Sequence, residues 1–237
     1  MAPRQDIAAA SAATSSPIRE RGRSQAVDDY VKAIWLLLES GNQPTGQAIA
    51  ARLSVSQASV TSMLRKLDDI GLVTWQRYRV VELTDSGRSL ALEIVRHHRL
   101  IECLLAEVLG MPWDEVHDEA EVLEHHISER LEDLISARLG HPQFDPHGHP
   151  IPARDGSMPD QRVRPLSALH RCDRASISQV RDDRPEVLRY LADIGLVIGA
   201  EFEVHACEPL AGTITLALSP STTRTIGSEL AARIDVA

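Results

Sequence analysis

Histidine and glutamate side chains recur at helical spacing in one stretch of the chain, and His98 and Glu102 open it four residues apart. Four more follow at relative positions 0, 4, 7 and 8: His117, Glu121, Glu124 and His125. On a helix turning 100° per residue these four point at about 0°, 40°, −20° and 80°, so they share one face. Imidazoles and carboxylates crowded together repel each other unless a cation lies among them. The spacing therefore predicts a site for a divalent transition metal, which accepts such nitrogen and oxygen ligands.

Other uses of these residues are weaker. A single histidine on an apolar helix is usually a hydrogen-bonded core residue, but three histidines and three glutamates at this spacing favour a metal. His97 and His126 point off the shared face, and we expect them at the surface. The sequence lacks the HExxH arrangement of zinc proteases, a nucleophile elbow, a P-loop and a dinucleotide fingerprint. We therefore expect no enzyme, and a metal-dependent hydrolase is only a remote alternative.

The net charge of −9 is distributed unevenly. Residues 1–90 carry 11 Lys and Arg against 9 Asp and Glu, whereas residues 91–140 carry 4 against 12. The acidity is thus concentrated around the histidine–glutamate face and leaves the first 90 residues free to approach nucleic acid. A solvated acidic helix surface would explain the excess equally simply, but a site that metal neutralises explains the histidines as well.

The bulk composition indicates a cytoplasmic protein. No run approaches 18 apolar residues, so no membrane span is expected. Residues 1–24 are rich in Ala, Ser and Arg and predict a disordered tail rather than an export signal. The three cysteines show no CxxC spacing, which favours a reducing compartment over a disulfide framework.

The first third of the chain predicts a winged helix-turn-helix domain over residues 25–90. Apolar residues at helical spacing indicate a helix over 26–40, while Thr45 and Ser56 are expected to cap two further helices joined by a tight turn. The segment 72–83 then reads as a hairpin wing. Tri-helical cores also occur in proteins that do not bind DNA, but the basic wing favours DNA binding. The residues expected to contact DNA are Ser56, Gln57, Ser59, Thr61, Ser62, Arg65, Lys66, Arg77 and Arg79.

Residues 91–140 predict a metal-binding and dimerisation domain. One helix is expected from Thr84 to Gly110 and a second from an Asp114 cap to about Leu139. Their apolar faces exceed what a single winged helix covers, so we expect a homodimer. These faces hold Leu92, Val95, Leu100, Leu104, Val108, Val116, Ala120, Leu123, Ile127, Leu131 and Leu134.

The remaining residues predict a linker and a small all-β domain. Six prolines mark 141–165 as an irregular linker, and short strand-like runs in 166–237 indicate an SH3-like β-barrel interrupted by one helix. The expected fold class is therefore mainly α with a small β-barrel.

This order of elements, with the segments HRLIE, VHDEAEVLEHH and DPHGHPIP, resembles the diphtheria toxin repressor family of metal-dependent transcriptional repressors over about residues 25–237. The resemblance implies an FeoA-type C-terminal domain and two metal sites per subunit. The primary site would comprise Asp29, Glu121, Glu124 and His125. The ancillary site would comprise His98, Glu102 and His117, completed by Asp182 or Gln179.

The resemblance also bears on the metal. Iron-responsive members carry methionine and cysteine at the positions of Asp29 and Glu121, whereas oxygen ligands at both indicate the manganese-responsive branch, because harder ligands favour Mn²⁺. Some manganese-responsive members have a glutamate at the position of Lys32 that holds a second, adjacent ion, so Lys32 favours two separated sites. We expect a dimeric Mn²⁺-dependent repressor of metal-uptake genes on a palindromic double-stranded operator. An Fe²⁺-responsive repressor and a metal buffer that binds no DNA are the alternatives.

Overall fold

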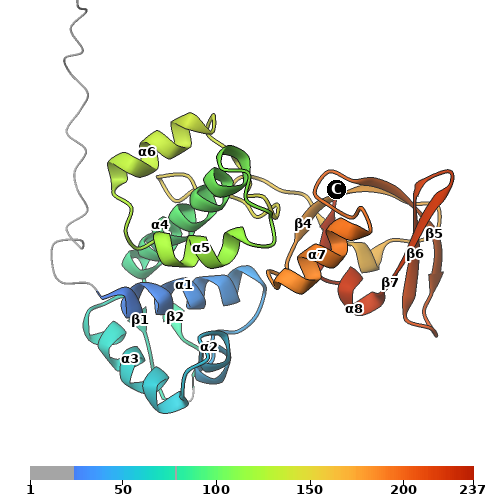
Figure 1. Ribbon diagram of the computed structural model, residues 1–237. Helices are drawn as coiled ribbons and strands as arrows, with labels where there is room; N and C mark the ends of the chain where they lie inside the picture. Colours follow the sequence, from blue (N-terminus) through green and yellow to red (C-terminus); the bar gives the residue numbers. More distant parts are fainter. Residues whose placement is uncertain (1–23, 78) are drawn as a thin grey trace, which may run out of the picture.

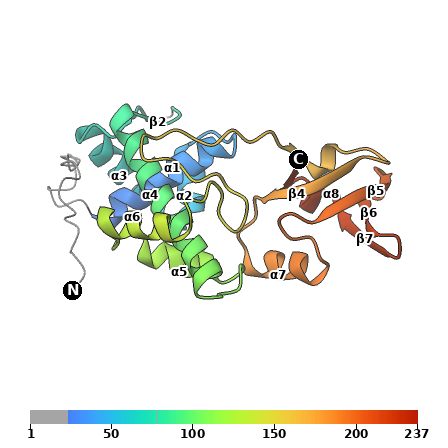
Figure 2. The same ribbon diagram turned by 90° about the horizontal axis from the view of Figure 1, so that it is seen from above.

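The computed structural model describes residues 24–77 and 79–237, which form a helical lobe and a smaller lobe built around a β-sheet (Figure 1). Viewed from above, the two lobes lie side by side, joined by the long connection that follows the last helix of the first lobe (Figure 2). The tail predicted for residues 1–24 lies, apart from Ser24, outside the described residues. Within the described part, no helix is long and apolar enough to cross a lipid bilayer.

The helical lobe begins with the predicted helix-turn-helix and wing. Its elements are α1 (Gln25–Glu39), α2 (Gly46–Arg52), α3 (Gln57–Asp69), β1 (Val73–Thr74) and β2 (Glu82–Leu83). Thr45 and Ser56 act as the predicted caps, since their hydroxyls accept hydrogen bonds from the backbone N–H groups of Ala48 and Ser59. The two short strands pair antiparallel, which confirms a hairpin after α3. Tyr78, near its tip, lies outside the described residues.

The next helix crosses the lobe and supplies much of its core. It comprises α4 (Asp85–Cys103), continued without a break by a π-helical segment, η1 (Leu104–Val108). Apolar side chains of α4 pack with those of the first three helices in one cluster that includes Ile34, Ile49 and Leu64. This packing fixes α1 against α4, and both helices carry candidate metal ligands.

The single helix predicted from Asp114 to Leu139 is wrong. The chain forms α5 (Val116–Leu123), a turn, and α6 (Glu129–Arg138). Glu115, rather than Asp114, precedes α5, and the hydroxyl of Ser128 caps α6 by accepting from Leu131 N–H. The local reason for the break is this capping serine, which favours a helix start within the predicted helix. Glu124 is therefore the C-cap residue of α5, and His125 follows it in the turn.

The second lobe is a six-stranded antiparallel sheet with two helices. Its elements are β3 (Arg164–Pro165), η2 (Leu166–Ala168), β4 (Arg174–Val180), α7 (Pro185–Asp193), β5 (Glu201–Glu208), β6 (Thr213–Ser219), β7 (Thr222–Gly227), α8 (Ser228–Ala231) and β8 (Ile234–Val236). The strand order is β3-β8-β4-β5-β6-β7, so β3 and β7 are the two edges. This pairing gives an antiparallel sheet domain; closure into the predicted barrel does not follow from it.

The connection over residues 141–163 has the irregular backbone that its prolines predict, but it packs tightly between the lobes. Asp145 and His147 are buried in it. The carbonyl of His147 accepts a hydrogen bond from Val180 N–H at the end of β4. Gly148 has a positive φ of 85°, and a Cβ there would overlap the backbone of Ser178. Glycine is therefore required for this close approach.

Candidate metal centre

The end of α5 and the start of α1 meet at a cluster of three candidate ligands. His125 Nε2 lies 3.1 Å from Asp29 Oδ1 and 3.4 Å from Glu124 Oε1. Within the described residues, neither Glu124 Oε1 nor either ring nitrogen of His125 has a hydrogen-bond partner, although all three atoms are buried. Buried polar atoms without partners are costly, and a bound cation would satisfy them. These three side chains therefore fit a metal ion, and we call them the primary cluster.

Glu121, the fourth predicted primary ligand, faces another partner. Its Oε1 lies 2.6 Å from Lys32 Nζ, 3.8 Å from His117 Nε2 and 3.9 Å from His98 Nδ1. Burial alone would raise the pKa of Glu121, but the ammonium of Lys32 and then His98 lower it. The structure thus places Glu121 between the two predicted sites rather than with Asp29 and His125.

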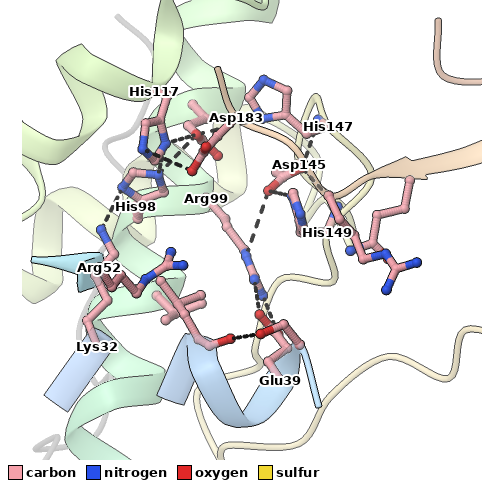
Figure 3. Close-up of a pocket in the computed structure, with 16 residues that line it drawn as sticks. Lys32, Glu39, Arg52, His98, Arg99, His117, Asp145, His147, His149 and Asp183 are labelled. Carbon is pink, nitrogen blue, oxygen red and sulfur yellow. Dashed lines mark hydrogen bonds and ion pairs between the residues drawn. The ribbon is translucent and has the colours of Figure 1, made fainter. Parts of the chain in front are cut away.

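A second cluster lies where α4 faces α5. His98 Nε2 is 3.0 Å from Glu102 Oε1 and 3.1 Å from His117 Nδ1, and His117 Nδ1 is 3.3 Å from the same carboxylate oxygen. Three ligand atoms this close could share one ion. The structure therefore brings together the three predicted ancillary residues, which we call the ancillary cluster. His98 is also one of the residues lining a cavity of about 180 Å³ (Figure 3).

Buried charges within the ancillary cluster shift the pKa values of His98 and Glu102 in opposite directions. Burial and Lys32 would both lower the pKa of His98, but Glu102 and Glu124 outweigh them and raise it to about 9. For Glu102, burial favours the neutral acid, yet His98 and His117 hold the pKa well below its ordinary value. In the metal-free protein, cationic imidazole thus compensates the buried carboxylate, which is the role an ion would take over.

The second lobe places the two residues predicted to complete the ancillary site, Asp182 and Gln179, in different surroundings. Asp182 is engaged by Arg184 and Arg233 through hydrogen bonds of 2.6–2.8 Å, which hold its pKa at about 2. Its neighbour Asp183 instead reaches the ancillary cluster, with Oδ2 3.6 Å from His117 Nε2. Gln179 lines the same cavity. Of the two neighbouring aspartates, Asp183 is thus the one that reaches His117, whereas Asp182 is held by the two arginines.

The connection between the lobes adds a histidine that the sequence interpretation left out of both sites. His147 Nδ1 lies 3.7 Å from Glu102 Oε1, and its Nε2 lies 2.7 Å from the carbonyl oxygen of Trp113. The Nε2–H group donates to that carbonyl, which orients the ring with Nδ1 facing Glu102. The carboxylate of Asp145 accepts from the backbone N–H groups of His147 and His149, which fixes the loop (Figure 3). The DPHGHP run, a carboxylate with two alternate histidines, was the signal available in the sequence.

The two histidines that flank the candidate ligands, His97 and His126, differ in their exposure to solvent. His126 is exposed, as predicted. The surface placement predicted for His97 is wrong, because it is buried and its Nε2 lies 3.0 Å from Glu132 Oε2. Arg96 also binds Glu132, at 2.6 Å. Helix α6 packs over this side of α4, so a position off the ligand face is covered by another helix rather than by water.

The candidate DNA-contacting residues lie where a recognition helix would present them. Most are exposed on α3 or next to it, including Gln57, Ser59, Ser62, Arg65 and Lys66. Two hydroxyls already have local partners. Ser56 caps the helix, and half-buried Thr61 donates to the carbonyl of Gln57. Arg77 and Arg79 are exposed on the wing.

The apolar surface proposed for dimerisation is smaller than predicted. Leu92, Val95, Leu100, Val116 and Ala120 are buried within the protomer. The large apolar side chains that remain exposed around η1, α5 and α6 are Val108, Leu109, Val122, Leu123, Leu131 and Leu134. Leu109 and Val122 are more than 60% exposed, which is unusual for a surface that stays in water.

Three family models match successive parts of the chain. Residues 24–81 match the family model of an iron-dependent repressor N-terminal DNA-binding domain, residues 84–153 that of an iron-dependent repressor metal-binding and dimerisation domain, and residues 164–237 that of an FeoA domain.

Among relatives, the iron-dependent repressor IdeR of Mycobacterium bovis is 41% identical over 123 residues, which span 52% of this chain and about half (54%) of that protein. IdeR of Mycobacterium leprae is 31% identical over 220 residues, or 87% of this chain and 94% of that protein. A solved manganese-dependent transcriptional repressor in complex with manganese is 42% identical, with a TM-score of 0.82 over 89% of this chain and 98% of that one.

Proposed function

The chain belongs to the diphtheria toxin repressor family of metal-dependent transcriptional repressors, and from this premise we propose that it is a Mn²⁺-dependent, dimeric repressor of metal-uptake genes. It binds a palindromic operator in the cytoplasm and catalyses no reaction. The relatives of this chain include both iron-dependent and manganese-dependent repressors. The choice of metal must therefore be inferred from the chain's own candidate ligands.

The primary cluster carries the proposal. Asp29, Glu124 and His125 offer carboxylate oxygen and imidazole nitrogen, and no sulfur atom is among them. The nearest cysteine in sequence to the ancillary ligands, Cys103, is buried and donates to the carbonyl of Phe144. Oxygen-rich sites suit Mn²⁺, whereas thiolate and thioether ligands favour softer ions. The donor set therefore fits Mn²⁺.

The same three side chains explain how an ion would act on DNA binding. Asp29 is on α1, which packs in the core of the DNA-binding unit, whereas Glu124 and His125 follow α5 in the proposed dimerisation region. An ion at this cluster supplies positive charge that holds the carboxylates together. Asp29, Glu124 and His125 then tie α1 to the dimer and favour one orientation of α3. Two such helices would enter successive major grooves.

The ancillary cluster completes a proposed two-site arrangement. His98, Glu102 and His117 would hold a second ion, with Asp183 and His147 as the nearest additional donors from the second lobe and the connection. Because these two residues lie on different segments, an ion here would hold the second lobe against the helical lobe.

The decisive experiment measures DNA binding as a function of metal. A duplex selected from a random pool in Mn²⁺ is titrated with stripped protein in Mn²⁺, in anaerobic Fe²⁺ and in chelator, using fluorescence anisotropy at fixed salt. We expect binding in Mn²⁺ that is lost in chelator. Equal affinity in chelator would contradict a co-repressor ion, and no DNA binding at low salt would support the metal buffer.

Iron is the second candidate, because divalent-metal affinity usually ranks Fe²⁺ above Mn²⁺ and one group of relatives is named iron-dependent. A stronger response to anaerobic Fe²⁺ than to Mn²⁺, each at matched free concentration, would assign the protein to iron.

A further inference from the structure

One buried ammonium lies between the two candidate metal clusters. Lys32, on α1, is about 5% exposed. Its Nζ is 2.6 Å from Glu121 Oε1, 2.6 Å from Glu124 Oε2 and 3.1 Å from His98 Nδ1. All three neighbours are candidate ligands, and they come from both α4 and the α5 region. Figure 3 shows Lys32 reaching His98 from below.

These three neighbours would themselves suit a metal ion. His98, Glu121 and Glu124 each offer one ligand atom, and the three atoms lie within 4.8 Å of one another. The Lys32 ammonium donates hydrogen bonds to both carboxylates, and its Nζ also lies 3.1 Å from His98 Nδ1. A buried cation at this point compensates two carboxylates that would otherwise repel each other in a poorly solvated space.

The bonds to Lys32 also divide the Glu124 carboxylate. Oε2 accepts from Lys32 and is 2.6 Å from His98 Nδ1, whereas Oε1 faces His125 without a hydrogen-bond partner among the described residues. Fixing one oxygen leaves the other directed at the primary cluster, as outer partners of metal ligands commonly do.

We propose that Lys32 is a permanent internal cation, whose ammonium fills a third cation position between the two metal clusters and positions Glu124 for the primary ion. This rests on the proposed metal dependence. Lys32 would thus do more than keep the two metal sites separate, because it also has a function in the metal-free protein. There Lys32 holds ligands of both clusters assembled before any ion arrives.

The test compares wild type, Lys32→Met and a matched control, Arg52→Met, in the full-length chain. Arg52 and Lys32 both line the cavity of about 180 Å³ beside His98, so the loss of Arg52 removes an equal charge from the same cavity. In chelator, the melting temperature of Lys32→Met should fall by about 6 °C or more, because a buried carboxylate pair loses its counter-charge. Arg52→Met should melt close to wild type.

The second readout counts ions. After equilibration with Mn²⁺ and gel filtration, metal analysis should find one more Mn²⁺ per subunit in Lys32→Met than in wild type or Arg52→Met. The Mn²⁺ electron paramagnetic resonance spectrum of this variant should show exchange coupling between neighbouring ions, which wild type lacks. Mn²⁺ should also raise the melting temperature of Lys32→Met more than that of wild type.

The proposal requires both the lower melting temperature in chelator and the additional Mn²⁺ ion in Lys32→Met. An unchanged melting temperature in chelator, or an unchanged ion count, would overturn the proposal. Should Lys32→Met not fold without metal, Lys32→Gln replaces it in the chelator experiment, because the amide can still hydrogen-bond but carries no charge. If wild type itself binds no Mn²⁺, the proposed function fails, while the melting temperatures in chelator still decide whether Lys32 assembles these residues.

Discussion

His98 Nδ1 lies 2.6 Å from Glu124 Oε2, so one hydrogen bond joins a residue of the ancillary cluster to a residue of the primary cluster. The opposite ring nitrogen of His98 faces Glu102, and the opposite oxygen of Glu124 faces His125. Each residue thus orients the other towards its own cluster. A substitution at either position should therefore affect both clusters.

Glu124→Gln tests the primary cluster most directly. The amide keeps the shape of the side chain but loses the negative charge that an ion requires, so metal affinity should fall by about 10- to 100-fold or more. Mn²⁺-dependent anisotropy of an operator duplex should be lost at metal concentrations that saturate wild type. The control is Glu119→Gln, which removes an exposed carboxylate from α5, five residues before Glu124. Wild-type Mn²⁺ sensitivity in Glu124→Gln would remove this residue from the site.

Asp183→Asn and Asp182→Asn separate the two neighbouring carboxylates. Asp183 is half-exposed beside His117, so its substitution should weaken the second Mn²⁺ and leave stability unchanged. Asp182 is buried against two arginines, so its substitution should cost about 1–2 kcal/mol, a value reduced for the exposure of those partners, with metal binding unchanged. Isothermal titration with Mn²⁺ and urea unfolding give the two readouts. The reverse pattern would restore the original prediction of Asp182.

Glu132 should make a pH-dependent contribution to stability. Burial would raise its pKa, but hydrogen bonds from His97 and Arg96 lower it from 4.5 to about 2. A carboxylate with a depressed pKa stabilises the folded state above its ordinary pKa, and this contribution is lost as the pH falls from about 4.5 to about 2. Glu132→Gln should therefore lose about 3 kcal/mol at pH 7 and show a shallower decline in acid. Urea unfolding across pH 2.5–7 compares the two proteins. Parallel curves would contradict the assignment.

The sequence was sufficient to predict the local features of the helices. Thr45 and Ser56 cap the helices they were expected to cap, because a side-chain cap depends on a few adjacent residues. His98 and Glu102 also share one helix face, as their spacing predicts, because both lie within the continuous helix α4.

The placements that the sequence did not predict depend on contacts between different segments of the chain. The helical projection grouped Glu121 with His125, but α5 ends at Leu123 and Glu121 instead lies 2.6 Å from Lys32 on α1. The choice of Asp183 over Asp182 depends on Arg233, which is about fifty residues away. His97 is buried because α6 folds back over α4, which its own position on the helix does not reveal.

Leu134→Glu tests the apolar surface of the proposed dimer. Leu134 is 59% exposed on α6, and a charge there would have to be desolvated in an interface. We expect the variant to be monomeric at micromolar concentration in analytical ultracentrifugation, with unchanged circular dichroism. The matched control is Leu210→Glu, at a fully exposed position between β5 and β6. A dimeric Leu134→Glu would place the interface elsewhere.

Arg65→Ala and Ser62→Ala should separate the two kinds of DNA contact on α3. Arg65 is exposed and carries a positive charge, so we expect it to contact a phosphate; its loss should weaken all duplexes alike and reduce the slope of log affinity against log salt by about 1. Ser62 is exposed and uncharged, so its loss should leave the salt slope unchanged and alter the base preference. Anisotropy titrations of the selected operator and of single-base variants at several salt concentrations measure both effects. If Arg65→Ala changes sequence preference while its salt slope stays at the wild-type value, Arg65 reads a base edge and not the backbone.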